Sequence, residues 1–98
     1  MSTELTSRQR AKLRGMAMNL KPIVMIGKQG LTATALKELD AALKREELIK
    51  VRVTTKTREE RATLMDEIAN RTNSAYCGAT GATASYYRAG ETPRIKLD

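Results

Sequence analysis

Two apolar segments separated by a helix-sized interval constrain the fold of this chain more than any other feature. Ile23 to Ile26 form a continuous apolar run, and Leu48 to Val53 alternates apolar and basic residues from Ile49 on. The interval begins near Thr32 with a helical period whose apolar positions are Ala35, Leu36, Leu39, Ala42 and Leu43. A strand, a helix and a strand within about thirty residues form a right-handed βαβ unit. We expect the first strand to be buried on both faces and the second on one.

A further helix is predicted before this unit. Thr6 and Gln9 suit a capping box, in which each residue satisfies a backbone N–H of the other. The helix should end before the Lys21–Pro22 pair, because a residue that precedes proline avoids the α region. Its apolar stripe has helical spacing and consists of Leu13, Met16, Ala17 and Leu20.

After the unit, the chain predicts a third helix and a hairpin. Thr57 and Glu60 form another capping box, Leu64, Met65 and Ile68 are the core positions, and the helix ends at 71–73. Residues 75–88 carry β-prone segments on either side of Thr80–Gly81, and an extended tail covers 94–97. The predicted fold is therefore one α/β (α+β) domain over residues 1–98. It is a compact α-β-α-β-α-β-β sandwich with a four-stranded mixed sheet.

The charge of the chain is basic and is concentrated in its first third. Eighteen Lys and Arg oppose eleven Asp and Glu, which gives a net charge of +7. Such a balance favours an anionic partner. On the first helix, basic residues flank both sides of the apolar stripe, and each suits either a binding surface or an ordinary solvated face. They are Arg8 and Lys12 on one side and Arg10 and Arg14 on the other.

A Gly-Lys-Gln-Gly loop is the strongest candidate for binding. Gly27, Lys28, Gln29 and Gly30 lie between the first strand and the start of the second helix. The free N–H groups and partial positive charge of a helix N-terminus attract phosphate, and Lys28 adds a full charge. A G-x-x-G loop clamps the nucleic-acid backbone in KH domains. An ordinary strand-to-helix turn has the same spacing, so the loop alone does not decide between the two.

The residues around this loop resemble a known family. Residues 20–32, Leu-Lys-Pro-Ile-Val-Met-Ile-Gly-Lys-Gln-Gly-Leu-Thr, resemble the signature of the CRM (chloroplast RNA splicing and ribosome maturation) domain, and in particular the bacterial stand-alone YhbY family. Glu47 to Val53 is similar to the central strand of that family, and Tyr87–Arg88 to an aromatic–arginine pair near its last strand. The resemblance covers residues 5–88 and leaves 89–98 as a tail.

The resemblance implies a fold, a partner and a site. The family fold is similar to the C-terminal domain of translation initiation factor three, and its loop is related to that of KH domains. Family members bind RNA, and bacterial members associate with precursors of the large ribosomal subunit. By this resemblance Gly27, Lys28, Gln29 and Gly30 would contact RNA, and the charge pattern adds Arg8, Lys12, Arg14 and Lys21. Lys56 lies outside the matched motifs, so we expect its replacement to cost much less than replacement of Lys28 and Gln29.

The last hairpin departs from the family pattern. Family members often place a basic residue after the hairpin glycine and large aliphatic residues in the final strand. Here Gly81 is followed by Ala-Thr-Ala-Ser at 82–85. We therefore expect a thin local core, and an RNA contact from this hairpin stays open. For Arg88, RNA binding and a purely structural role both remain open.

Other functions receive little support from the residues. The chain has no His and one Cys, so it offers no His general base, no His metal ligand and no thiolate zinc site. We expect no enzyme activity, no cofactor and no small-molecule substrate. A basic adaptor that binds an acidic protein within ribosome-assembly particles remains an alternative. The sequence shows no helix with base-reading residues typical of DNA recognition.

The compartment can also be predicted. Cys77 is alone, which suits a reducing compartment and a structural thiol. The first residues are polar and lack the apolar stretch of a secretory signal, and no apolar run approaches the roughly 20 residues of a membrane span. We expect a cytoplasmic monomer that is not associated with a membrane.

Overall fold

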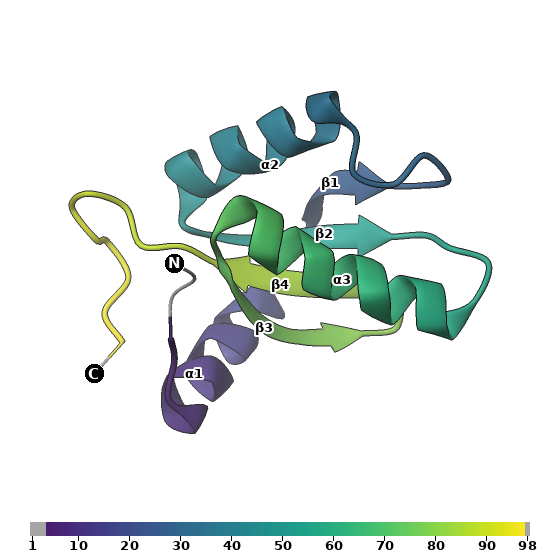
Figure 1. Ribbon diagram of the computed structural model, residues 1–98. Coiled ribbons are helices and arrows are strands. Elements are labelled where there is room, and N and C mark those ends of the chain that lie inside the picture. The colour runs from purple at the N-terminus through teal and green to yellow at the C-terminus, as the bar shows by residue number, and fades with distance from the viewer. Residues whose placement is uncertain (1–3, 98) are drawn as a thin grey trace.

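The chain folds around one four-stranded sheet with the strand order β1-β2-β4-β3 (Figure 1). In this computed structural model, residues 4–97 are described. β1 and β2 are parallel, whereas β4 is antiparallel to both β2 and β3, so the sheet is mixed as predicted. The elements are α1 (Ser7–Ala17), β1 (Pro22–Ile26), α2 (Ala33–Glu46), β2 (Leu48–Val53), α3 (Arg58–Thr72), β3 (Ala75–Thr80) and β4 (Thr83–Tyr87).

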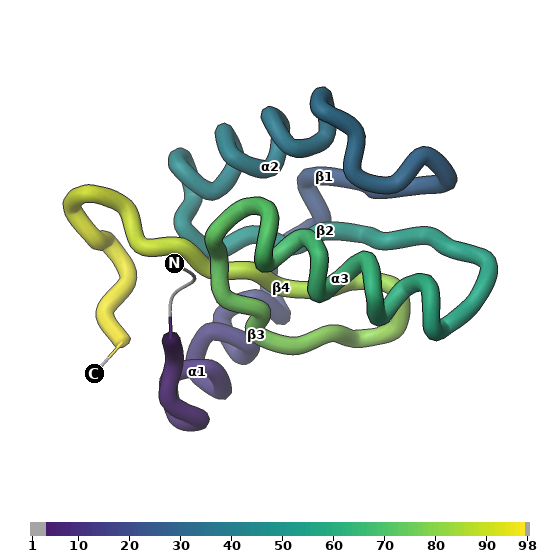
Figure 2. Tube along the Cα trace, in the orientation of Figure 1, coloured from purple at the N-terminus to yellow at the C-terminus, as the bar shows by residue number. Residues whose placement is uncertain are grey.

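The helices cover opposite faces of this sheet. α2 and α3 lie side by side on one face and α1 lies on the other, as the ribbon and the tube both show (Figures 1 and 2). The predicted sandwich is confirmed. Because the two parallel strands are joined through α2, their carboxyl ends point to the same edge of the sheet. The Gly-Lys-Gln-Gly loop and the β2–α3 loop therefore lie at the same end of the molecule (Figure 1).

Two apolar cores result, one on each face. The core under α2 and α3 is the larger and is formed by Val24, Ile26, Ala35, Leu39, Ala42, Leu43, Ile49, Val51, Val53, Met65, Ile68, Ala84 and Tyr86. The core under α1 consists of Leu13, Ala17, Leu48, Cys77 and Tyr87. Burying a Leu, Ile, Val or Met side chain stabilises a fold by roughly 1.5–3 kcal/mol, so the α2–α3 side supplies most of the hydrophobic stabilisation.

The predicted helix starts are correct, and one helix is shorter than its apolar stripe predicted. Thr6 and Gln9 form the full capping box of α1, with hydrogen bonds of 3.1 and 3.0 Å. Thr57 caps α3, but the Glu60 carboxylate contacts the Thr57 hydroxyl and not its backbone N–H, so that box is only half formed. α1 ends before Lys21 as predicted, but it ends at Ala17, so Leu20 of the predicted stripe lies outside the helix.

The early end of α1 follows from the turn toward β1. The N–H groups of residues 18–20 bond three residues back, to the carbonyls of 15–17, so the last turn is tightened and the chain leaves the helix axis. Leu13 and Ala17 are buried as predicted, whereas Met16 and Leu20 are 39% and 38% exposed. The apolar stripe continues beyond the helix that was expected to bury it.

β1 is buried on one face only, which corrects the prediction of two buried faces. Val24 and Ile26 are buried beneath α2, but Ile23 and Met25 are 46% and 74% exposed. β1 is an edge strand, and α1 does not extend over it. A short apolar run does not show whether other elements pack on both faces of a strand. For β1, packing on the second face depends on the position of the distant helix α1.

The hairpin β3–β4 forms about the predicted turn, and tyrosines fill the core where aliphatic residues are missing. Tyr86 is fully buried on the α2–α3 side, and its hydroxyl donates a 2.7 Å hydrogen bond to the carbonyl of Met65. Tyr87 is buried on the α1 side. The small Ala84 and Ser85 are also buried, because β4 lies between β2 and β3. The two tyrosines therefore supply the bulk of this part of the core.

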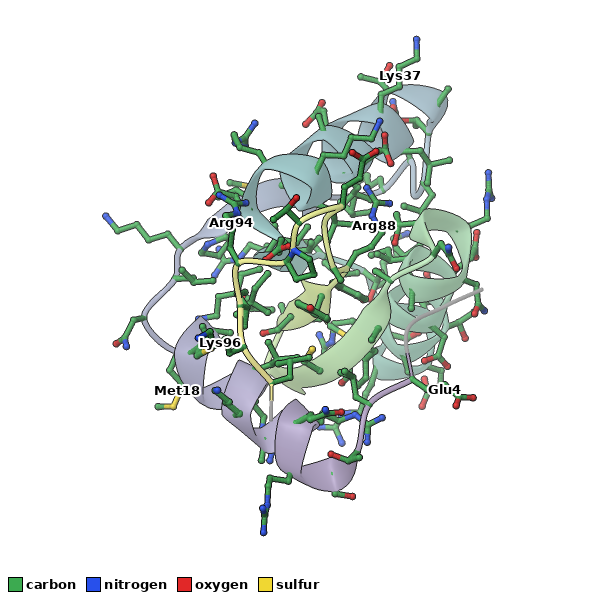
Figure 3. The ribbon with its side chains drawn as sticks, turned by 90° about the vertical axis from the view of Figure 1, so that its left-hand side faces the viewer. Glu4, Met18, Lys37, Arg88, Arg94 and Lys96 are labelled. Carbon is green, nitrogen blue, oxygen red and sulfur yellow. The ribbon has the colours of Figure 1, made fainter. Side chains whose placement is uncertain are left out.

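The tail after β4 is attached by one buried carboxylate. Glu47 accepts hydrogen bonds from the backbone N–H groups of Gly90, Arg94 and Ile95, at 2.6, 3.0 and 3.2 Å. The tail then descends toward α1 (Figure 3), where Ile95 and Leu97 pack on the α1-side core. Residues 89–97 of the tail form no strand. Its two apolar residues nevertheless extend the core past residue 88.

Candidate nucleic-acid interface

The Gly-Lys-Gln-Gly loop is an exposed turn closed by its own backbone. The N–H of Gly30 donates to the carbonyl of Gly27 at 2.9 Å, and Gly30 has a φ of 68°, a left-handed conformation that favours glycine. Gly27, Lys28 and Gln29 are exposed. The loop therefore presents backbone and one cationic side chain to solvent, without a covering element.

The N-terminus of α2, which follows the loop, carries the partial positive charge of the helix dipole. Thr32 caps α2 by accepting the N–H of Ala35 at 3.0 Å, and the first turn holds no acidic residue. The partial positive charge of the α2 N-terminus is therefore not neutralised within that turn. Together with Lys28, it makes the loop end of α2 favourable for a phosphate group.

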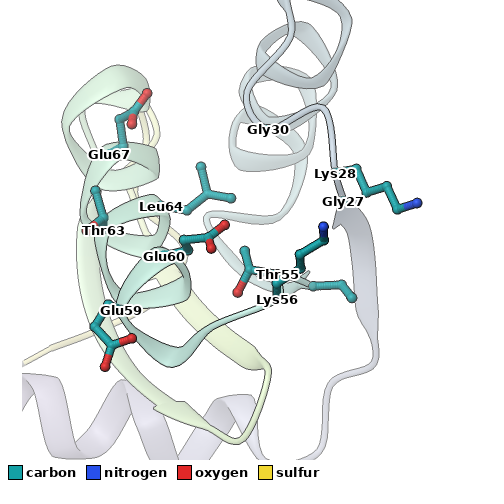
Figure 4. Close-up of a pocket in the computed structure, with 11 residues that line it drawn as sticks. Gly27, Lys28, Gly30, Thr55, Lys56, Glu59, Glu60, Thr63, Leu64 and Glu67 are labelled. Carbon is teal, nitrogen blue, oxygen red and sulfur yellow. The ribbon is translucent and has the colours of Figure 1, made fainter.

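The β2–α3 loop runs beside this turn and forms a groove with it. The N–H of Thr54 donates to the carbonyl of Ile26 at 2.8 Å, which holds the two loops together at the ends of β1 and β2. Their residues and one face of α3 border an open groove of about 970 Å³ (Figure 4). Its lining residues are Gly27, Lys28, Gly30, Thr54, Thr55, Lys56, Glu59, Glu60, Thr63, Leu64 and Glu67.

The two sides of this groove carry opposite charge. Lys28 and Lys56 are on the loop side, while Glu59, Glu60 and Glu67 line the α3 side. The close-up shows the Lys28 side chain extending away from α3, and the Lys56 side chain lying between the two sides (Figure 4). A polyanion is therefore attracted to the loop rim and repelled from the α3 wall. This asymmetry favours a phosphate backbone that follows the loops.

Lys56 lies beside the Gly-Lys-Gln-Gly loop in the structure. It was placed outside the binding motifs, yet it lines the same groove as Lys28. The parallel β1–β2 pair explains why, since residues just past both carboxyl ends meet at one edge of the sheet. That rule, applied to the predicted βαβ unit, was the signal that could have identified Lys56.

The other predicted basic residues do not join the loop. Lys21 precedes β1 and so lies at the opposite end of that strand from Gly27. Arg8, Lys12 and Arg14 are on α1, across the sheet from α2. The Lys12 ammonium donates to the backbone carbonyl of Lys96 in the tail.

Arg14 has a packing role beside its charge. A Cβ added at Gly78 would come within 2.8 Å of Arg14 Cδ, so the aliphatic part of the Arg14 side chain lies directly over Gly78.

Sequence reasoning missed two further basic residues on the α1 side of the sheet, Lys50 and Arg52. Their alternation with buried Ile49, Val51 and Val53 was the available signal.

The Arg88 guanidinium is hydrogen-bonded to other parts of the fold. Its guanidinium donates to the carbonyl of Thr72 at 2.7 Å and to the carbonyl and carboxylate of Asp40 at 3.2 and 2.9 Å. The Arg88 side chain is 19% exposed. These contacts join β4 to α2 and α3, and they give Arg88 a structural role.

Cys77 is also internal. Its thiol is fully buried in the α1-side core, and burial raises its pKa to about 11.

Among residues 4–97, His, Cys, Asp and Glu side chains do not gather in groups that could hold a metal ion. No helix in that range is long and apolar enough to cross a membrane.

Comparison with known proteins identifies the family. The model of the CRS1/YhbY (CRM) domain matches residues 5–88, which include the groove loops, the sheet and all three helices. The chain belongs to the CRS1/YhbY (CRM) family. The resemblance inferred from the loop motif and the β2 segment is thereby confirmed, with the same boundaries.

Relatives of this CRM protein match over nearly their whole length. An RNA-binding protein of Haemophilus influenzae is 37% identical over 95 residues, which cover 97% of this chain and 96% of the relative. A probable RNA-binding protein of Pseudomonas aeruginosa is 33% identical, over 95% of this chain and 89% of the relative. One of Bacillus subtilis is 31% identical, over 95% of this chain and 98% of the relative.

A solved structure shares the fold of this CRM protein. The solution structure of a hypothetical Staphylococcus aureus protein, described as a candidate for RNA binding, superposes with a TM-score of 0.85 and 32% identity. The match covers 97% of this chain and all of the other. The mixed α+β architecture with a four-stranded sheet is therefore a fold that a relative also adopts.

Proposed function

We propose that this CRM protein binds RNA through the Gly27–Gly30 loop and Lys56, and that it assists assembly of the large ribosomal subunit. The observation that carries the proposal is the pairing of an exposed cationic turn with a helix N-terminus that has no acidic residue in its first turn. Backbone N–H groups and a helix end of this kind bind phosphate in many proteins.

The names of the relatives support an RNA partner, since three of them are RNA-binding or probable RNA-binding proteins. The ribosomal part of the proposal comes from the resemblance to stand-alone bacterial members, which associate with precursors of the large subunit. The chain has no His and one buried Cys, so its residues support binding and not catalysis. We further propose that it acts as a monomer in the cytoplasm.

The charges of the groove support a backbone-directed mode of binding. Phosphates would follow the loop rim, close to Lys28 and Lys56, and keep away from the carboxylates of α3. The chain contains three Tyr and no Phe or Trp. Base stacking on aromatic rings is therefore a small contribution, and charge and backbone hydrogen bonds supply most of the affinity.

The proposal is tested by replacing Lys28 and Gln29 together with Asp. Both side chains are exposed, so the fold should survive, with a stability change of about 0.5 kcal/mol or less. Two carboxylates would face the phosphates, and we expect the affinity for structured ribosomal RNA to fall at least about tenfold at fixed salt. Circular dichroism of each variant checks the fold.

A charge-matched control is available on α2. Lys37→Asp with Ala41→Asp makes the same change in net charge at two exposed positions outside the groove. This control should lose much less affinity than the loop variant. Equal losses in both variants would show that net charge alone governs binding, and no loss in the loop variant would remove the loop from the interface.

The ribosomal part needs a cellular measurement. Crosslinking in cells, followed by sequencing of the attached RNA, should recover large-subunit ribosomal RNA. The protein should also sediment with large-subunit precursors, and the loop variant should not. Recovery of other RNA classes alone would leave RNA binding in place and overturn the role in ribosome assembly.

A further inference from the structure

The sheet face on the α1 side is only partly covered. α1 packs Leu13 and Ala17 against Leu48, Cys77 and Tyr87, at one end of that face. Toward the other end, the β1–β2 register pairs Met25 with Arg52, and the β2–β4 register pairs Arg52 with Thr83 and Lys50 with Ser85. These side chains lie on the face opposite the α2–α3 core, because their neighbours Ile26, Val51 and Val53 are buried there.

Most of the exposed large apolar side chains lie in one segment of the chain, which contributes to this surface. Six large hydrophobic side chains are exposed among residues 4–97, and five of them fall between residues 16 and 25. The two most exposed are Met18, at 77%, and Met25, at 74%. Figure 3 shows Met18 projecting from the end of α1 into solvent. Methionine is flexible and polarisable, and it is common at surfaces that adapt to protein partners.

Basic residues accompany the methionines. Arg14, Met18 and Lys50 line one small hollow between α1 and the sheet, and none of the nine residues that line it is acidic. Arg52 is exposed beside Met25 on the neighbouring strand. We call the surface formed by Arg14, Met18, Met25, Lys50 and Arg52 the methionine–basic face. Its basic side chains are complementary to acidic groups of a partner. Its exposed methionines are complementary to an apolar surface on the same partner.

We propose that the methionine–basic face is a docking site for a protein partner that presents an acidic amphipathic helix. Such a helix has an apolar stripe to cover Met18 and Met25, and carboxylates beside the stripe to pair with Lys50 and Arg52. One end of this face adjoins the proposed RNA site, because Met25 lines a hollow together with the Gly27–Gly30 loop and Glu38. Met18 and Lys50 line a different hollow, between α1 and the sheet.

The observations favour this partner over RNA and over a second copy of the chain. The face offers no aromatic ring for base stacking, since Tyr76 and Tyr86 contact each other on the α3 side and Tyr87 is buried. An RNA strand would pair with the cations but leave the methionines against a polar backbone. Self-association through this face would bring Lys50 and Arg52 against the same cations of the partner copy, in a chain of net charge +7.

The test uses the full chain with labelled methionine methyl groups, observed by NMR. The probe is a helical peptide of about 18 residues with leucines at i, i+3, i+4 and i+7, flanked by glutamates. Saturable shifts of Met18 and Met25 are expected, while buried Met65 serves as an internal reference. One control peptide replaces the glutamates with lysines and a second replaces the leucines with serines, and neither should shift these methyl groups.

Variants locate the site on the protein. Lys50→Glu with Arg52→Glu should lower the affinity for the acidic peptide at least about tenfold. Met18→Ser with Met25→Ser should lower it by a similar factor. Lys28→Asp with Gln29→Asp should weaken peptide binding much less than Lys50→Glu with Arg52→Glu, because Lys28 and Gln29 only border the end of the face at Met25. If the acidic peptide produces no shift, or if the lysine peptide binds equally well, the proposal is wrong. If single-stranded RNA shifts Met18 and Met25 and the double glutamate variant abolishes that effect, the face belongs to RNA, which also overturns it.

Discussion

The guanidinium of Arg88 and the carboxylate of Asp40 form an ion pair of 2.9 Å that joins the end of β4 to the middle of α2. Arg88 also donates to the carbonyl of Thr72, at the end of α3. The Arg88 guanidinium and the Lys44 ammonium hold the pKa of the Asp40 carboxyl below its usual value. One side chain thus joins three elements on the α2–α3 side of the sheet.

Replacing Arg88 with Ala should reduce stability and spare RNA binding. The variant loses hydrogen bonds to two elements and leaves the Thr72 carbonyl without this donor, so we expect a loss of about 2 kcal/mol in the free energy of unfolding. Urea denaturation measures this loss. RNA affinity at a temperature where the variant is folded should match that of the wild type. A folded variant with greatly reduced affinity would restore Arg88 as an RNA contact.

Lys56→Asp should weaken RNA binding, because Lys56 lines the groove beside Lys28. If Lys56 contacts one phosphate, removing it should reduce the slope of log affinity against log salt by about 0.7–0.9. Titrations at several salt concentrations give this slope. Lys37→Asp, on the exposed surface of α2, is the matched control and should leave the slope unchanged. Equal slopes for wild type and Lys56→Asp would place the RNA backbone away from this side of the groove.

Glu47→Gln should loosen the tail. Burial alone raises the pKa of the Glu47 carboxyl, but the N–H groups of Gly90, Arg94 and Ile95 outweigh it, so the pKa lies below its usual value. We expect a stability loss of about 2 kcal/mol at neutral pH and faster tryptic cleavage after Arg94. Glu46→Gln, the exposed neighbour, is the control and should change neither quantity.

The same carboxylate predicts a pH dependence. Since the folded pKa of Glu47 is lowered, its contribution to stability is complete above the unfolded pKa and is lost as the pH falls through the folded pKa. The stability difference between wild type and Glu47→Gln should therefore shrink from pH 6 to pH 3. Urea denaturation at both values checks this sign. A difference that grows on acidification would mean that the folded pKa of this carboxyl lies above its unfolded value.

Cys77→Ser should leave RNA binding unchanged. The thiol is fully buried, and its raised pKa of about 11 keeps it protonated at neutral pH. We expect slow alkylation by iodoacetamide in the folded protein and fast alkylation in urea. The serine hydroxyl can still donate to the carbonyl of Ala75, as the thiol does, so a stability loss of about 1 kcal/mol is expected. Rapid alkylation of the folded protein would contradict this assignment.

The sequence predicted the elements that depend on local signals. The caps at Thr6 and Thr57, the start of α2 near Thr32 and the end of α3 within 71–73 are properties of a few adjacent residues, and all four occur where expected. The position of the Gly27–Gly30 loop followed from the βαβ pattern and the family motif. These features depend little on how distant elements pack.

The features that were missed depend on distant contacts. Met25 is exposed because α1 ends before it could cover that part of the sheet. The hydrogen bonds of Arg88 depend on acceptors in α2 and α3. Lys56 joins Lys28 only because β1 and β2 are parallel neighbours. A pattern along the chain shows which face of a strand is apolar, but it cannot show whether another element covers that face.

The position of β1 at the edge of the sheet has a consequence for amide hydrogen exchange. β1 is bonded only to β2, and its register is irregular between Pro22 and Val24, whereas β2 and β4 are paired on both sides. Opening β1 therefore breaks one ladder, and the central pair can remain intact. Amides of β1 should lose protection before those of β2 and β4, so the Gly27–Gly30 loop can change its path on a ligand without global unfolding.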